Sequence, residues 1–183
     1  MSTQIFLNNS TTGLVGLFTQ TVNSVAVGGA TNTGSLLGTG IGTLTVPANT
    51  FVAGDSFKLN LGGHIDAING KKLRVIVSST AGAIFADTNQ ITMPNCTNQH
   101  WNLEIVFTIR KLGGPIDAQI ASSGVFLYTK DASTAFEGDN FSLVNSTTFD
   151  TTVSNTLKVE VSWDTTDVGN SIYSETGILT KIF

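Results

Sequence analysis

Residues 101–110, Trp-Asn-Leu-Glu-Ile-Val-Phe-Thr-Ile-Arg, decide the fold, because every second side chain in this stretch is large and apolar. The apolar positions are Trp101, Leu103, Ile105, Phe107 and Ile109, and the positions between them are Asn102, Glu104, Val106, Thr108 and Arg110. An apolar residue at every second position is the pattern of a β-strand with one face in a core. This stretch therefore predicts a long strand whose Trp101 side chain faces inward.

The same alternation occurs in three other parts of the chain, at residues 57–65, 73–77 and 157–163. Trp163 falls on the apolar parity of the last stretch, so both tryptophans are expected in the core and not as platforms for a sugar ring. No stretch long enough for a helix shows the three-to-four spacing of an amphipathic helix. The sequence therefore predicts an all-β protein.

Turn-forming residues separate these strands at short intervals. Asn69-Gly70 predicts a tight hairpin turn, and Gly113-Gly114-Pro115 ends the 101–110 strand because proline cannot donate to a ladder. Further breaks are expected at Pro47-Ala48-Asn49, Pro94-Asn95, Glu137-Gly138-Asp139 and Asp167-Val168-Gly169-Asn170. This spacing predicts about eight to ten short antiparallel strands, the number typical of a two-sheet sandwich or jelly roll.

The choice between sandwich families follows from length and cysteine content. An immunoglobulin-type domain has about 100 residues and often pairs two cysteines, whereas this chain has 183 residues and one cysteine, Cys96. We therefore expect a single jelly-roll β-sandwich that is held by packing, without a disulfide. No linker divides the chain, so the domain is expected over residues 13–183, after an N-terminal arm at residues 1–12.

The amino-acid composition indicates which classes of partner the chain is expected to bind. Charged residues make up 12% of the chain, against about 25% in an average soluble domain, and the formal net charge is −4. This acidic balance argues against nucleic acid as a partner. Residues 1–6 lack the basic and apolar regions of a secretory signal, and no stretch approaches the ~20 apolar residues that cross a bilayer. We expect synthesis in a cytoplasm and no membrane partner.

Some apolar residues fall on the outward parity of their strands. They are Ile76, Val106 and one of each neighbouring pair among Val125, Phe126, Leu127 and Tyr128. A sheet with few charges and outward apolar groups stays soluble more readily when another copy of the chain covers it. We therefore expect a cyclic homo-oligomer, and specifically a trimer.

The arrangement that most resembles a chemical site is His64-Ile65-Asp66 with His100 downstream, which is the residue set of a two-histidine, one-carboxylate iron site. An iron site of this kind must face into the barrel, but His64 and His100 share the polar parity of their strands and are expected to point outward. The sequence also lacks a His-x-His pair, a zinc-ligand set and a Gly-x-Ser-x-Gly motif. We therefore predict no catalytic, cofactor or metal site, and no enzyme activity.

Two acidic loops remain as candidate calcium sites. One contains Asp131, Glu137 and Asp139, and the other contains Asp164 and Asp167. Calcium takes several oxygen ligands from a flexible loop, but aspartate is also a common turn former. The turn-forming interpretation is favoured.

Several turn and strand-end motifs carry a family resemblance. They are Gly-Ile-Gly-Thr-Leu-Thr-Val-Pro-Ala-Asn at residues 40–49, Gly-Asp-Ser-Phe at 54–57, the 101–110 stretch, Phe149–Leu157 and Ser171–Glu175. With them, the chain from Gly13 onward resembles small jelly-roll virion proteins of tailed phages and of large DNA viruses of protists. In strand count alone it is also similar to the trimeric heads of the tumour-necrosis-factor (TNF) and complement type.

The resemblance implies a viral structural protein that is made in the host cytoplasm and resides in the virion. It would be a minor capsid, spike, fibre-head or decoration component, with other virion proteins as partners. The alternative is a glycan- or receptor-binding head domain of a virion, in which Tyr128 or Tyr173 contacts a host sugar.

Overall fold

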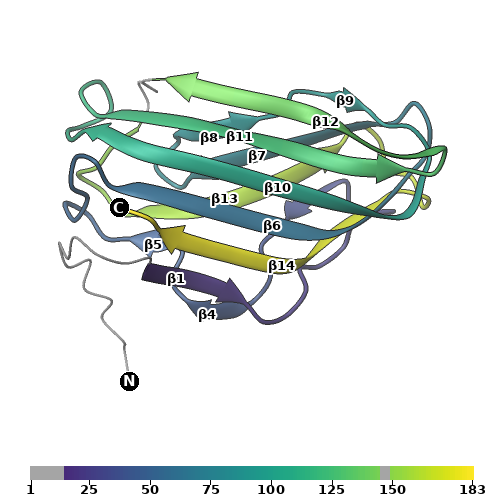
Figure 1. Ribbon diagram of the computed structural model, residues 1–183, viewed down its shortest axis with the longest axis horizontal. Coiled ribbons are helices and arrows are strands. Elements are labelled where there is room, and N and C mark those ends of the chain that lie inside the picture. The colour runs from purple at the N-terminus through teal and green to yellow at the C-terminus, as the bar shows by residue number, and fades with distance from the viewer. Residues whose placement is uncertain (1–14, 145–148) are drawn as a thin grey trace.

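A computed structural model describes residues 15–144 and 149–183, which form two antiparallel β-sheets packed face to face (Figure 1). The predicted arm, residues 1–12, lies outside the described residues, as do residues 13 and 14 of the predicted domain. Within the described ranges there is no helix, so the all-β prediction is confirmed for this part of the chain. It accordingly contains no helix with the length and hydropathy needed to span a membrane.

The strands of the larger sheet lie in an order that differs from their order in the sequence. The eight-stranded sheet contains β12 (Ser133–Val144), β11 (Gln119–Lys130), β10 (Cys96–Lys111), β6 (Ser56–Ala67), β14 (Ser171–Lys181), β1 (Val15–Gln20) and β4 (Gly40–Gly42) in that order, and β2 (Val27–Gly28) also pairs with β14. The long central strand β6 therefore has β10 on one side and β14 on the other (Figure 1).

The smaller sheet covers the inner face of the larger one. The six-stranded sheet contains β3 (Thr33–Ser35), β13 (Asn155–Trp163), β7 (Lys72–Ser79) and β8 (Ile84–Asp87) in that order, with β5 (Thr45–Val46) on β13 and β9 (Ile91–Thr92) on β7. The described residues thus contain more strands than the eight to ten predicted. Five of them, β2, β3, β4, β5 and β9, have only two or three residues and cannot display a period of two in the sequence.

The core lies between the two sheets and is built from the inward residues of alternating strands. Along β6, buried residues alternate with half-buried ones over the whole strand, and β10 and β13 follow the same rule over most of their lengths. Trp101 and Trp163 are 3% and 2% exposed, which confirms the prediction that both face inward. Each fully buried large apolar side chain contributes roughly 1.5–3 kcal/mol, so packing alone can hold a chain whose one cysteine is free.

The break predicted at residues 137–139 is wrong, because β12 continues through this segment. A Cβ atom on Gly138 would lie 1.9 Å from the carbonyl oxygen of Phe126 on β11. Glycine is therefore required here for close approach of two paired strands, and it does not mark a turn. The chain reverses between β11 and β12 at residues 131–132 instead.

Candidate functional site

Three ring side chains lie next to one another on the outer face of the eight-stranded sheet. His100 on β10 is directly opposite His64 on β6, and His64 is directly opposite Tyr173 on β14. The two imidazole centroids are 4.5 Å apart with the rings nearly perpendicular, and the rings of His64 and Tyr173 stack at 5.9 Å. His100 is exposed, whereas His64 and Tyr173 are half-buried. This group is called the His64 cluster below.

Two irregularities in the neighbouring strands aim polar groups at His64. The register of β10 shifts between Cys96 and Gln99, where Asn98 has a positive φ of 49°, and the register of β14 shifts at Glu175. The Asn98 side-chain oxygen Oδ1 lies 2.7 Å from His64 Nδ1, and the Glu175 oxygen Oε2 lies 3.3 Å from His64 Nε2. β-Bulges commonly redirect a side chain in this way, so the ring of His64 is held from both sides by residues that regular strands would not bring there.

The two ring nitrogens of His64 have different polar neighbours. Nδ1 lies beside the side-chain amide of Asn98, and Nε2 lies beside the carboxylate of Glu175. An imidazole nitrogen can donate or accept, so the tautomer of the ring decides which group donates in the Asn98 contact. Tyr173 stacks along one face of the same ring.

Hydrogen bonds that involve backbone atoms hold together the strands that carry the cluster. The indole Nε1 of Trp101 donates to the carbonyl oxygens of His64 and Tyr173, each at 3.1 Å, and so joins β10 to β6 and β14. The backbone N–H of Asn98 donates to Oδ1 of Asp66 at 2.7 Å. The cluster thus lies on three hydrogen-bonded strands of the sheet and not on a loop.

The three residues of the hypothetical iron site have the placement that their parity predicted. His64 and His100 point outward and meet on the outer face, and Asp66 is linked to them through Asn98. Among the residues that the structure describes, no group of three or more histidine, cysteine, aspartate and glutamate side chains is arranged to hold a metal ion. Sequence reasoning did not include Asn98 or Glu175, which contact His64 in the cluster.

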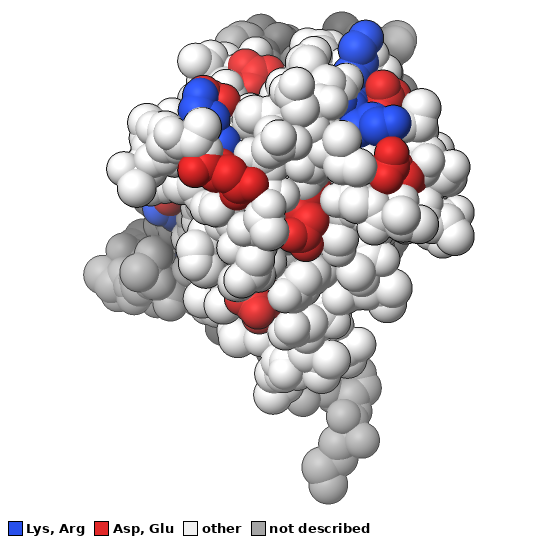
Figure 2. All heavy atoms as spheres, turned by 90° about the vertical axis from the view of Figure 1, so that its right-hand side faces the viewer, with Lys and Arg blue, Asp and Glu red and all other residues white. Residues whose placement is uncertain are grey.

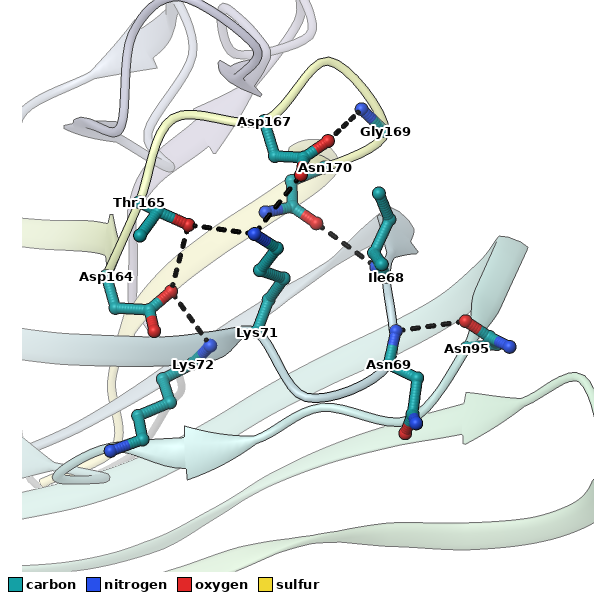
Figure 3. A network of polar contacts seen from close by, with 10 residues as sticks. All are labelled: Ile68, Asn69, Lys71, Lys72, Asn95, Asp164, Thr165, Asp167, Gly169 and Asn170. Atoms are coloured by element: carbon teal, nitrogen blue, oxygen red, sulfur yellow. Dashed lines mark hydrogen bonds and ion pairs between the residues drawn. The ribbon is translucent and has the colours of Figure 1, made fainter.

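The second acidic loop, between β13 and β14, is packed against the loop between β6 and β7 (Figure 3). Asp167 accepts a hydrogen bond from the backbone N–H of Gly169 at 3.0 Å and pairs with Lys71 at 3.2 Å. These contacts, with the Gly169 N–H as the largest cause, lower the pKa of Asp167 from its ordinary value. Asp164 accepts from the backbone N–H of Lys72 at 3.0 Å. This is the hydrogen bonding expected of turn-forming carboxylates.

The first acidic loop behaves similarly. Asp131 accepts from the N–H and the hydroxyl of Thr97, both at 2.7 Å, and from Gln99 at 2.9 Å, and the Thr97 bonds lower its pKa. Glu137 pairs with Lys130. Figure 2 shows this end of the molecule, where carboxylates and lysines form scattered small groups among mostly uncharged side chains. Four described carboxylates of the two loops therefore already accept bonds from protein donors: Asp131, Glu137, Asp164 and Asp167. Asp139 has no such bond among the described residues.

Two cavities of the described part of the molecule are lined by uncharged residues. One of about 30 Å³ lies between the sheets, is lined by phenylalanine and aliphatic side chains and by Asn155, and has room for little more than water. A groove of about 580 Å³ at the β1–β4 edge is lined by residues 16–19 and 41–43, which carry no charge. Neither space brings together the acid, base or nucleophile that a catalytic pocket needs.

The thiol of Cys96 gives a testable prediction about reactivity. Cys96 is buried at the start of β10, its Sγ donates to the carbonyl oxygen of Thr129 at 3.4 Å, and burial is the main cause that raises its pKa from 9.0 to about 11. Two pKa units correspond to about a hundredfold smaller thiolate fraction. We expect a thiol reagent such as dithionitrobenzoate at pH 8 to react at least about a hundredfold more slowly with the native protein than with the urea-unfolded protein. Similar rates for the two forms would contradict the buried placement of Cys96.

No protein-family model, curated protein or solved structure matches the chain in comparisons of sequence and fold. Its function must therefore be inferred from the described geometry and from the resemblance noted in the sequence.

Proposed function

We propose that the chain is a virion structural protein with a single jelly-roll fold, and that it assembles as a homotrimer through the outer face of its eight-stranded sheet. The protein would be made in the host cytoplasm and would act by shape, as a scaffold that contacts other virion proteins. The fold, the interface and the virion role are each supported by a separate observation.

The jelly-roll assignment is supported by strand pairing. If the hairpin β11–β12 is set aside as an addition at one edge, eight principal strands follow in the order β1, β3, β6, β7, β8, β10, β13 and β14. The first pairs with the last, the second with the seventh, the third with the sixth and the fourth with the fifth. This nested antiparallel pairing is what results when one long hairpin is rolled into two sheets of Greek-key connectivity.

The choice of interface rests on the difference in charged residues between the two outer faces of the sandwich. On the six-stranded sheet, the outward residues include Lys72, Arg74, Asp87, Lys158 and Glu160. Arg74 donates to Asp87 at 2.9 Å, and this bond is the largest cause that lowers the pKa of Asp87. This face has the charged composition expected of a surface that remains in water.

The central part of the other outer face carries two charged residues, Lys58 and Glu104, among mostly uncharged ones. The outward residues there are Asn102, Glu104, Val106 and Thr108 on β10, Lys58 and Asn60 on β6, and Thr176, Ile178 and Thr180 on β14. Lys58 and Glu104 form an ion pair at 2.9 Å and so compensate each other. Beside β10, β11 adds the half-buried Val125 and Leu127. Interface cores are depleted in charge, so this is the face that a copy of the chain would cover.

A pair of matched substitutions tests the interface. Leu127 and Ile76 are both half-buried outward residues, but they lie on opposite faces of the sandwich. We expect Leu127→Lys to convert the oligomer to monomer, because association would bury an unpaired ammonium group. Ile76→Lys, beside Asp87 and Glu160, should leave the oligomer unchanged. Multi-angle light scattering gives the mass, which for the wild type should be three times the 19.2 kDa of one chain. A wild-type mass of one chain at micromolar concentration would overturn the proposal.

The virion role is supported by the resemblance to small jelly-roll virion proteins, and quantitative mass spectrometry of purified particles tests it. A copy number that is a multiple of three would support a trimeric structural component. Absence of the polypeptide from particles would refute the role, even if the protein is a trimer in solution.

The alternative, a glycan-binding head, is favoured by one observation. Tyr173 is half-buried and stacks on His64, whose other neighbours are the exposed His100 and the amide of Asn98, so an aromatic ring lies in a group that could stack against and hydrogen-bond a sugar. Tyr128 cannot take this part, because it is 3% exposed and burial is the main cause that raises its pKa to about 12. Reproducible binding on a glycan array that is lost in Tyr173→Ala would favour the head over the scaffold.

A further inference from the structure

We propose that residues 4–8 of the chain's own N-terminal segment add a strand at the open edge of the eight-stranded sheet, beside β4. The uncharged groove at the β1–β4 edge is then the docking site for this segment. The added strand goes beyond the proposed function and does not require a trimer. Three features support it: the unpaired edge of β4, the apolar groups around that edge, and the sequence that leads into β1.

The edge of β4 presents backbone groups that can pair with another strand. Among the described residues, β4 is the last strand on this side of the sheet, next to β1 (Figure 1). The N–H of Thr43 donates to the carbonyl oxygen of Leu17 at 2.7 Å, so Thr43 and, two residues earlier, Ile41 face β1. Gly40 and Gly42 alternate with them and point their N–H and C=O groups to the open edge. A row of such groups is a template for a further strand.

Apolar groups lie on both faces of the sheet at this edge. On the outer face, Ile41 is 74% exposed, and Ile178, two strands away in the same row, is 46% exposed. On the inner face, Gly40 has no side chain, and the place of a Cβ atom there is taken by the ring of Phe18, 2.6 Å away. The ring of Phe18 therefore extends to the edge of the core. A strand beside β4 would contact Ile41 on one face and Phe18 on the other.

The sequence that precedes β1 has the composition that this edge requires. Residues 1–14 lie outside the described residues and contain no aspartate, glutamate, lysine or arginine, which matches the uncharged groove. Residues 4–8 read Gln-Ile-Phe-Leu-Asn. Successive side chains of a strand face opposite sides, so three consecutive apolar residues fit a strand that is covered on both faces. With Phe6 beside Ile41, Ile5 and Leu7 would lie on the side of Phe18.

The chain's own segment is long enough to reach this edge. Because β1 and β4 are antiparallel, a strand parallel to β4 ends at the end of the sheet where β1 begins with Val15. Neighbouring strands are about 4.8 Å apart, so the new strand would lie about 10 Å from β1, with β4 between them. Residues 9–14 join the two and can span up to about 20 Å. This short connection gives an effective concentration on the order of millimolar, which favours the chain's own segment over that of another copy.

Amide hydrogen exchange at the two edge glycines, followed by NMR of the nitrogen-15-labelled full chain, tests the added strand. We expect the amide protons of Gly40 and Gly42 to exchange at least about tenfold more slowly in the wild type than in Phe6→Asp, because docking would bury an unpaired carboxylate. The amide of Ile41 faces β1 and should change much less. The control Thr11→Asp adds the same charge outside residues 4–8 and should leave all three amides as in the wild type.

A mixing experiment distinguishes the chain's own segment from that of another copy. Labelled Phe6→Asp is mixed with an excess of unlabelled wild type, and the exchange of Gly40 and Gly42 in the labelled chain is measured again. These amides should remain fast, because each wild-type segment occupies its own edge. Slower exchange in the mixture would show that the segment docks on a neighbouring copy and would overturn the intramolecular strand. Equal rates in the unmixed wild type and Phe6→Asp would show that residues 4–8 do not cover this edge, and would leave the proposed trimer untouched.

Discussion

Replacement of Gly63 by alanine is expected to destabilise the protein by about 3 kcal/mol or more, because the added carbon atom has no space. Gly63 lies on β6 directly opposite Trp101, and a Cβ atom there would be 2.1 Å from the carbonyl oxygen of Tyr173 and 2.7 Å from the Cα atom of Ser174. Both contacts are to the backbone of β14, which cannot rotate away as a side chain would. The pairing of β6 with β14 must therefore open at the centre of the eight-stranded sheet.

The neighbouring residue provides the control. A Cβ atom on Gly62 would meet its nearest neighbours, the hydroxyl of Thr176 and the carbonyl oxygen of Trp101, at 3.4 Å, which is an ordinary contact. Gly62→Ala should change the free energy of unfolding by no more than about 1 kcal/mol, and in the stabilising direction, because alanine loses less backbone entropy than glycine. Urea unfolding followed by tryptophan fluorescence measures both variants. Equal losses in the two variants would show that the close approach at Gly63 is not what constrains the strand.

The long strands were predictable because each contains several repeats of a two-residue period. The expected strands at 57–65, 73–77, 101–110 and 157–163 correspond to the middles of β6, β7, β10 and β13. Strands such as β5, with two residues, carry no such signal and form because β13 offers them a partner. Tertiary pairing, which a single sequence does not display, determines these short elements.

The two histidines of the His64 cluster were predictable by the same reasoning. Parity placed His64 and His100 on the outer side of their strands, but it could not place Asn98 or Glu175, because both lie where the period is interrupted. A signal for both interruptions exists. The apolar residues Cys96 and Trp101 are five positions apart, and Ile172 and Leu179 are seven positions apart, yet both members of each pair are buried. Two inward residues at an odd spacing require an extra residue between them, which is a bulge.

Removal of the Asp55 carboxylate is the second change with a large expected effect. Asp55 lies just before β6 and pairs with Lys181 at the end of β14, with 2.7 Å between Oδ1 and Nζ. The two side chains are 6% and 12% exposed, and the second oxygen of Asp55 accepts from the backbone N–H of Val52 at 2.9 Å. Asp55→Ala would leave a buried ammonium group without its partner. We expect a loss of about 3–5 kcal/mol in the free energy of unfolding, measured by chemical denaturation.

A double substitution separates the cost of the unpaired charge from the contribution of the pair. When Lys181→Met accompanies Asp55→Ala, no charge remains to be desolvated, so the double variant should be more stable than Asp55→Ala alone. Lys58 and Glu104 provide the comparison, because their side chains are 35% and 46% exposed. At protein concentrations at which the chain is monomeric, Glu104→Gln should cost no more than about 1 kcal/mol, since water can solvate the remaining lysine. If Asp55→Ala cost as little as Glu104→Gln, Lys181 would have to reach solvent in the folded protein. The ion pair between Asp55 and Lys181 would then be an exposed contact.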